Sequence, residues 1–103
     1  MISRTMKLIF AAAVVLTALP LLAGYYEAGV RFFMHRQYDE AREQLSKAVE
    51  ASPGNGNAYY YLGETERNLG NYDKAIEFYQ KAVDNNASRK YFKMAYWNLV
   101  VLT

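Results

Sequence analysis

Apolar residues recur at helical spacing along most of the chain after residue 24. A first stripe has spacings of three and four residues, which place its members on one helical face: Tyr25, Ala28, Gly29 and Phe32. After a break near residues 36–37, a second stripe follows: Ala41, Leu45, Ala48 and Val49. The same two stripes then return on either side of a Leu-Gly-Asn turn at residues 69–71: Tyr59, Leu62 and Gly63, then Ala75, Tyr79, Ala82 and Val83. The pattern predicts two helical hairpins.

The two hairpins are related by an internal repeat. A shift of 34 residues aligns ten identical pairs, where composition alone would give about two: Tyr25/Tyr59, Tyr26/Tyr60, Gly29/Gly63, Tyr38/Tyr72, Asp39/Asp73, Ala41/Ala75, Glu43/Glu77, Lys47/Lys81, Ala48/Ala82 and Val49/Val83. A Ser-Pro-Gly-Asn-Gly segment at residues 52–56 separates the units. We expect the small residues Gly29, Ala41, Gly63 and Ala75 to let the two helices of each hairpin approach closely. The predicted repeats cover about residues 22–55 and 56–89.

These residues resemble the signature of the tetratricopeptide repeat family. The resemblance rests on Tyr59, Leu62, Gly63, the run Leu-Gly-Asn-Tyr-Asp-Lys-Ala at residues 69–75, Tyr79 and Ala82. It implies an all-α solenoid of antiparallel helical hairpins, occupying residues 24–103. Three positions depart from the family pattern: Glu66 stands where an aromatic residue is usual, Ala87 where proline is usual, and Arg36 where the first turn would have glycine.

A partial third repeat is expected over residues 93–103. The Ala-Tyr-Trp-Asn-Leu segment at residues 95–99 resembles the start of a first helix, about three residues late, so we expect an extended connection over residues 85–92. The helix ends in apolar residues 99–102. Two interpretations stay open: an array that continues beyond Thr103, which is favoured, or an end that docks onto another copy or a partner. Self-association would use Trp97, Val100, Val101 and Leu102.

The resemblance also implies a binding groove. First helices of such hairpins line the concave side of the array, which places these residues there: Tyr26, Val30, Phe33, Tyr60, Glu64, Arg67, Asn68, Trp97 and Asn98, with Val101 beside them. The alternative is that Tyr60 and Phe33 pack between neighbouring hairpins. The run Tyr59-Tyr60-Tyr61 must point three ways, so we expect one core, one groove and one rim residue.

One subgroup of the family holds the C-terminal carboxylate of chaperones in a clamp of Lys, Arg and Asn. At the matching positions this chain has Tyr26, Val30 and Tyr61. The sequence therefore argues against a chaperone-tail adaptor.

The N-terminal 23 residues have the order of a secretory signal peptide. Arg4 and Lys7 precede an apolar run over residues 8–16, and Pro20 and the small Ala23 follow it. We expect cleavage after Ala23 and an extracytoplasmic location, periplasmic or secreted. Two alternatives are a membrane anchor over residues 8–23, which is short of the roughly 20 residues that span a bilayer, and lipoprotein processing, which Tyr25 excludes because that signal requires cysteine.

Composition and charge narrow the chemistry. The chain has 12 Lys and Arg and 10 Asp and Glu, but residues 24–103 contain ten of each, which argues against a nucleic-acid partner. It has no cysteine and one histidine, His35, expected to be solvated. Acidic residues at the start of a helix, Asp39, Glu40 and Glu43, suit the helix dipole rather than acid–base work. Asn86-Ala87-Ser88 fits the N-glycosylation pattern. We expect no catalytic residues, metal or cofactor.

The sequence thus predicts an exported, non-enzymatic module that binds a protein or peptide partner in a concave groove. The alternative is a self-associating scaffold of a cell-envelope assembly, built through the apolar C-terminal helix. A homo-oligomer is a further expectation, and membrane contact is expected only if the N-terminal segment stays uncleaved.

Overall fold

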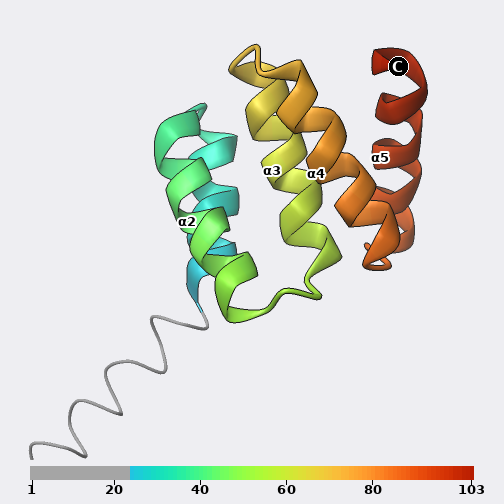
Figure 1. Ribbon diagram of the computed structural model, residues 1–103. Coiled ribbons are helices and arrows are strands. Elements are labelled where there is room, and N and C mark those ends of the chain that lie inside the picture. The colour runs from blue at the N-terminus through green and yellow to red at the C-terminus, as the bar shows by residue number, and fades with distance from the viewer. Residues whose placement is uncertain (1–23) are drawn as a thin grey trace, which may run out of the picture.

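The computed structural model describes residues 24–103, which form helices joined by short turns (Figure 1). Residues 24–34 are helical, and four further helices follow: α2 (Tyr38–Ala51), α3 (Gly56–Asn68), α4 (Tyr72–Asp84) and α5 (Arg89–Leu102). This part of the chain contains no strand, so the all-α prediction is confirmed. The predicted signal peptide, residues 1–23, lies outside the described residues.

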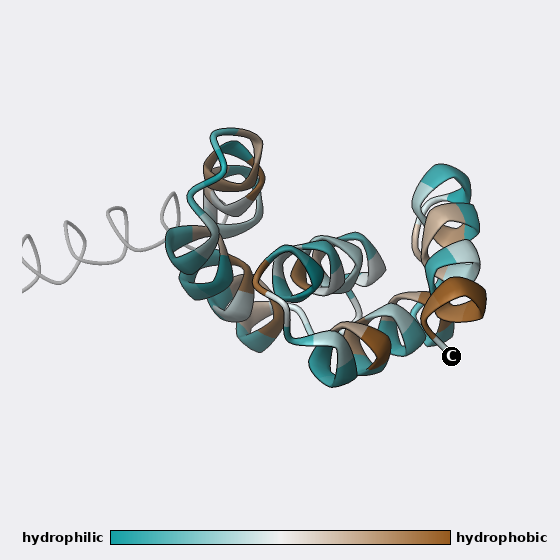
Figure 2. Ribbon diagram, turned by 90° about the horizontal axis from the view of Figure 1, so that it is seen from above, coloured by the Kyte–Doolittle hydropathy of each residue, from teal (hydrophilic) through white to brown (hydrophobic). Residues whose placement is uncertain are grey.

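Helices adjacent in the sequence pair as antiparallel hairpins. The helix over residues 24–34 lies behind α2 (Figure 1). Helices α3 and α4 stand together in the middle, and α5 packs against them at the edge. Seen from above, the helices follow an open arc with the C-terminus at one end (Figure 2). The architecture is therefore the predicted solenoid, with two hairpins and the first helix of a third.

Three helices end through the same backbone device. The second residue after the helix has a positive φ in each case: Arg36 (59°), Gly70 (82°) and Asn86 (51°). The next residue then donates its N–H to a carbonyl five residues earlier: Gln37 to Phe32 (2.9 Å), Asn71 to Glu66 (2.8 Å) and Ala87 to Ala82 (3.0 Å). These paired features are those of the Schellman motif, which satisfies carbonyls that the helix leaves free.

The first of these turns is expected to improve with glycine. Arg36 holds the left-handed conformation that Gly70 holds in the second hairpin, and this conformation costs a side chain about 1–2 kcal/mol. Allowing for the greater entropy of glycine in the unfolded chain, Arg36→Gly should raise the free energy of unfolding by about 0.5–1 kcal/mol. Thermal unfolding followed by circular dichroism measures it, with Gly70→Ala as the control expected to destabilise. A lower melting temperature for Arg36→Gly would contradict this reading of the turn.

Small residues let the two helices of each hairpin approach closely. A Cβ atom placed on Gly29 would lie 2.5 Å from Cγ of Leu45, and one on Gly63 would lie 2.6 Å from Cδ1 of Tyr79. Both contacts join a first helix to its second helix at positions 34 residues apart. Ala41 and Ala75 are likewise fully buried. The repeated small residues are therefore explained by packing.

Other repeated identities form a pair of matching surface contacts. The ammonium of Lys47 lies 5.7 Å from the ring centre of Tyr25, and that of Lys81 lies 5.8 Å from the ring of Tyr59. The glutamates four residues before each lysine complete the pattern: Glu43 at 3.4 Å from Lys47 and Glu77 at 3.8 Å from Lys81. A cation over an aromatic face is favourable, so these positions tie the two helices of each hairpin at the surface.

The connection before α5 differs from the sequence prediction. It spans only residues 85–88, where an extended segment over residues 85–92 was expected, and that prediction is wrong. The error came from aligning Tyr96 and Trp97 with the family signature, although both side chains are exposed. Two contacts instead keep the 34-residue period: Tyr60 with Met94 and Glu64 with Asn98.

Candidate functional site

The first helices of the three units present equivalent positions on one side of the array. We call these nine residues the first-helix surface, three from each helix at intervals of 34: Tyr26, Tyr60 and Met94; Val30, Glu64 and Asn98; Phe33, Arg67 and Val101. Contacts between α3 and α5 fix the alignment, since the Tyr60 hydroxyl lies 3.6 Å from Sδ of Met94 and Asn98 lies 2.8 Å from Glu64. The predicted groove residues are largely the members of this surface.

An aromatic cluster underlies this surface. Its centre is Tyr61, whose ring lies 6.1 Å from Tyr26, 5.4 Å from Phe33 and 5.2 Å from Tyr91, each near edge-to-face. Tyr60 stacks on Tyr91 with ring centres 4.8 Å apart. Such pairs contribute about 0.5–1.5 kcal/mol each beyond the area that they bury. The cluster joins the helix over residues 24–34, α3 and α5, so it holds the three units together.

Burial raises the pKa of three phenols of this cluster further above physiological pH. Burial is the main cause that raises the pKa of Tyr26 to about 12, with Tyr91 and Glu27 adding to it. The pKa of Tyr60 and that of Tyr61 are also raised, again chiefly by burial. The hydroxyls of Tyr61 and Tyr91 lie 2.9 Å apart and share a hydrogen bond. These groups act as hydrogen-bonding aromatic packing at physiological pH.

A buried carboxylate, Glu64, joins three elements. Its Oε1 accepts hydrogen bonds from the hydroxyl of Tyr79 in α4 (2.6 Å) and from Nδ2 of Asn98 in α5 (2.8 Å). Its Oε2 accepts from the guanidinium of Arg67, at 2.8 Å. Burial is the main cause that raises the pKa of Tyr79, and the hydrogen bond from the Tyr79 hydroxyl to Glu64 adds to it. The hydrogen bonds to Glu64 therefore hold α5 against α3 and α4.

A second buried carboxylate, Glu66, joins the two hairpins. Its side chain accepts two hydrogen bonds from Arg42 in α2, at 2.7 and 3.2 Å, and one from Nδ2 of Asn71, at 2.7 Å. Burial alone would raise the pKa of Glu66, but these hydrogen bonds and the charges of Arg42 and Lys74 lower it below its ordinary value of 4.5. The sequence showed only that an aromatic residue was missing here. The structure shows that an ion pair takes its place.

Glu66 makes the stability depend on pH. The folded protein keeps this carboxyl ionised at pH values where the unfolded chain already binds a proton, because its pKa is lowered by folding. Its contribution is therefore complete above about pH 4.5 and is lost as the pH falls through the folded pKa. Urea unfolding between pH 3 and pH 7 should show this loss, and the acid-side slope should be smaller in Glu66→Gln. An unchanged slope in Glu66→Gln would contradict the assignment.

The predicted groove residues differ in accessibility. Tyr60 and Glu64 are 4% and 7% exposed and belong to the packing between units. Tyr61 is buried as well, so the prediction that the three tyrosines would divide into core, groove and rim is wrong, because α5 covers two of them. Four residues keep intermediate exposure: Tyr26, Val30, Phe33 and Asn98. Arg67, Asn68, Met94 and Val101 are exposed. Met94 was missed, since only the corrected alignment of α5 brings it beside Tyr60.

Trp97 lies at the edge of the first-helix surface, three residues after Met94 and four before Val101 on α5. By the 34-residue period it corresponds to Gly63, which faces Tyr79 of α4, so Trp97 lies on the outward face of α5. Its side chain is 65% exposed, and Val100 and Val101 are exposed near it. Leu102 instead packs partly against the core. Self-association through Trp97, Val100, Val101 and Leu102 stays a prediction.

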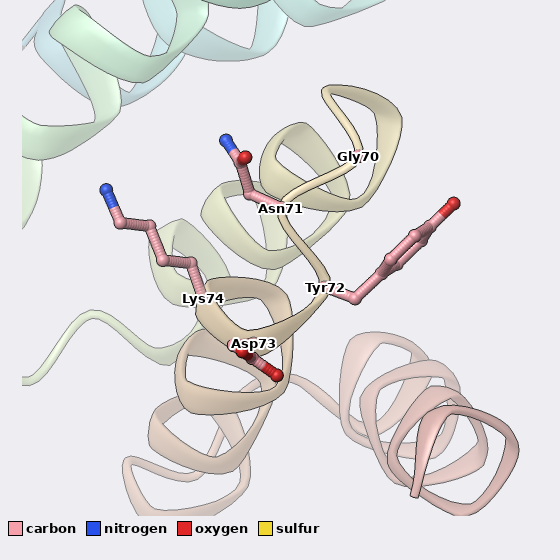
Figure 3. Close-up of a pocket in the computed structure, with 5 residues that line it drawn as sticks. All are labelled: Gly70, Asn71, Tyr72, Asp73 and Lys74. Atoms are coloured by element: carbon pink, nitrogen blue, oxygen red, sulfur yellow. The ribbon is translucent and has the colours of Figure 1, made fainter.

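Other candidate features offer little chemistry. A hollow of about 400 Å³ lies at the α3–α4 turn and is lined by residues 70–74, whose side chains point in different directions (Figure 3). His35 and Asn86 are exposed. Within residues 24–103, no group of acidic or histidine side chains is arranged to hold a metal ion. In the same part of the chain, no helix has the length and hydropathy needed to cross a membrane.

Comparison with known proteins agrees with this geometry. The tetratricopeptide repeat profile matches residues 26–90. Among solved structures, the crystal structure of MamA is similar, with a TM-score of 0.70 and 30% sequence identity over 79% of this chain and 46% of that chain. The match thus spans less than half of the MamA chain. The repeat, the hairpin architecture and the profile match together show that this chain belongs to the tetratricopeptide repeat family, whose domains generally serve as protein–protein interaction modules.

Proposed function

We propose that this chain is an exported, non-enzymatic module that binds a peptide or protein segment on its first-helix surface. The observation that carries the proposal is the accessible part of that surface. Arg67, Met94 and Val101 are exposed above partly buried aromatic rings. Apolar side chains around one cation, on a rigid aromatic base, suit a helical or extended peptide with apolar anchors.

The chemistry of the surface favours an adaptable apolar contact. Met94 contributes a flexible thioether that packs on side chains of varied shape. The charge of Arg67 is paired with Glu64 through one nitrogen, at 2.8 Å, and its side chain is 42% exposed. Because Glu64 holds the guanidinium in place, its remaining N–H groups can donate to a carbonyl or carboxylate of the bound segment.

A peptide selection tests the binding proposal. Peptides selected from a random displayed library on the immobilised protein are expected to bind the wild type and to lose at least tenfold in affinity to a Met94→Glu, Val101→Glu variant. Both positions are exposed, so the variant should keep its helical circular dichroism. The control is Arg31→Glu with Met34→Glu, two exposed positions elsewhere on the first described helix. Equal affinity for the variant and the wild type would refute the assignment.

The export part of the proposal rests on the order of charge, apolar run and small residue in residues 1–23. Fusion of residues 1–30 to a reporter enzyme that is active only outside the cytoplasm should give activity. Replacing Arg4 and Lys7 with glutamate should reduce that activity, because the positive charges orient insertion. A cytoplasmic, inactive fusion would count against export.

A further inference from the structure

Exposed apolar side chains concentrate on α5, and three of them, Tyr96, Trp97 and Val100, lie on its outward face. Helix α5 carries six of the eight large hydrophobic side chains that are well exposed in residues 24–103: Phe92, Met94, Tyr96, Trp97, Val100 and Val101. Such residues are individually normal on a surface, but their concentration on one element marks an interaction site. The outward face is defined here by Arg89, Lys90, Lys93, Tyr96, Trp97 and Val100.

The same face carries a one-sided charge. Arg89, Lys90 and Lys93 are exposed, and α5 contains no Asp or Glu. The remaining residues of 24–103 carry seven Lys and Arg and ten Asp and Glu. The cations occupy the N-terminal half of α5 and the aliphatic residues its C-terminal end. Figure 2 shows this as a change from teal to brown along α5 toward the end marked C.

Two features indicate what kind of partner covers this face. Trp97 stands at the period position of Gly29 and Gly63, where the second helix of each hairpin packs closely. A large ring there blocks the same close approach of a helix. A second copy meeting face to face would bring two sets of three cations together with no carboxylate in α5 to neutralise them. An anionic surface would neutralise the three cations of α5, and a fluid apolar layer would accommodate the ring of Trp97.

We propose that the outward face of α5 docks onto an anionic lipid bilayer. Arg89, Lys90 and Lys93 would pair with lipid phosphates, which attract cations near the surface. Tyr96 and Trp97 would sit at the level of the headgroups, where amphipathic rings are favoured. Val100 would enter the acyl boundary, so that charge and apolar contact act together as peripheral binding requires. The residues of this face do not include Met94 or Val101, the positions substituted in the peptide-binding test.

The single tryptophan of the chain makes the test specific. Because Trp97 is the only tryptophan, fluorescence of the full chain reports the outward face of α5 and not the apolar residues 8–16. With vesicles of phosphatidylglycerol and phosphatidylcholine, emission should shift to shorter wavelength, and lipids brominated on their acyl chains should quench it. Lys90→Gln with Lys93→Gln should weaken binding measured by this signal roughly thirtyfold, as expected for two surface cations.

The controls separate the remaining outcomes. Arg31→Gln with Lys74→Gln removes two exposed cations outside α5 and should leave the Trp97 signal unchanged. Vesicle binding without a change in Trp97 emission would mean that another segment carries the attachment, and it would overturn the proposal. A blue shift that depends on protein concentration and needs no vesicles would assign the face to a second copy instead, with the same consequence.

Discussion

Replacing Tyr79 with alanine is expected to lower the free energy of unfolding by about 4 kcal/mol, the largest effect of any single substitution considered. Tyr79 is fully buried. Its ring fills the space beside Gly63, which has no side chain to expand into the cavity. Its hydroxyl also donates to Glu64 at 2.6 Å, so the substitution removes one of the donors that satisfy a buried carboxylate. Urea unfolding followed by far-ultraviolet circular dichroism measures the loss.

The matched variant Tyr79→Phe separates the ring from the hydroxyl. It keeps the packing against Gly63 and leaves Glu64 with Arg67 and Asn98. A loss of about 1–2 kcal/mol is expected, the usual cost of removing one partner of a buried hydrogen bond. If Tyr79→Phe were as damaging as Tyr79→Ala, the dominant role given to the ring would be wrong.

Replacing Arg42 with methionine is expected to cost about 2–3 kcal/mol, because it leaves the carboxylate of Glu66 buried without its cation. Glu66 is 1% exposed and lies in α3, whereas Arg42 lies in α2. The value is at the low end for a broken buried pair because the Arg42 side chain is 38% exposed, which lets water reach its position. Chemical unfolding of the variant at pH 7 measures the effect.

A double substitution tests whether the cost comes from the unpaired charge. Arg42→Met with Glu66→Met should recover most of the loss, since an apolar pair of similar volume can replace a buried ion pair. The exposed pair of Lys47 and Glu43 provides the control, because Lys47→Met should change stability by no more than about 0.5–1 kcal/mol. Additive losses in the double variant would contradict the account of Glu66.

The fold could be predicted from the sequence because the repeat shows the same pattern of packing residues twice. Gly29 and Gly63 occupy equivalent positions since each faces the bulky residue of its second helix, Leu45 or Tyr79. A single hairpin would leave that match to chance, but 34-residue identity makes it visible. The sequence also predicts a helix in the region of α5, but with a late start, because the pattern treats the exposed Tyr96 and Trp97 as packing residues.

The site was less accessible to sequence reasoning because burial depends on neighbours. Tyr60 and Glu64 hold groove positions in the repeat, but α5 covers them through Tyr91 and Asn98. Nothing in the local pattern shows that a tyrosine at one position will stack on a tyrosine 31 residues later. Glu66 is a similar case, since the second repeat has Ile76 at the position of its partner Arg42, so the repeat pattern does not indicate this ion pair. Pairings between units require the assembled array.

The most direct test of the central claim is a map of where a selected peptide binds. Backbone amide chemical shifts of the isotope-labelled protein, recorded by nuclear magnetic resonance with and without the peptide, locate the contact without any substitution. The account predicts that the largest changes fall on the first helices, around Arg67, Met94 and Asn98, with smaller changes in α2 and α4. Changes concentrated on α2 and α4, with the first helices unaffected, would contradict it.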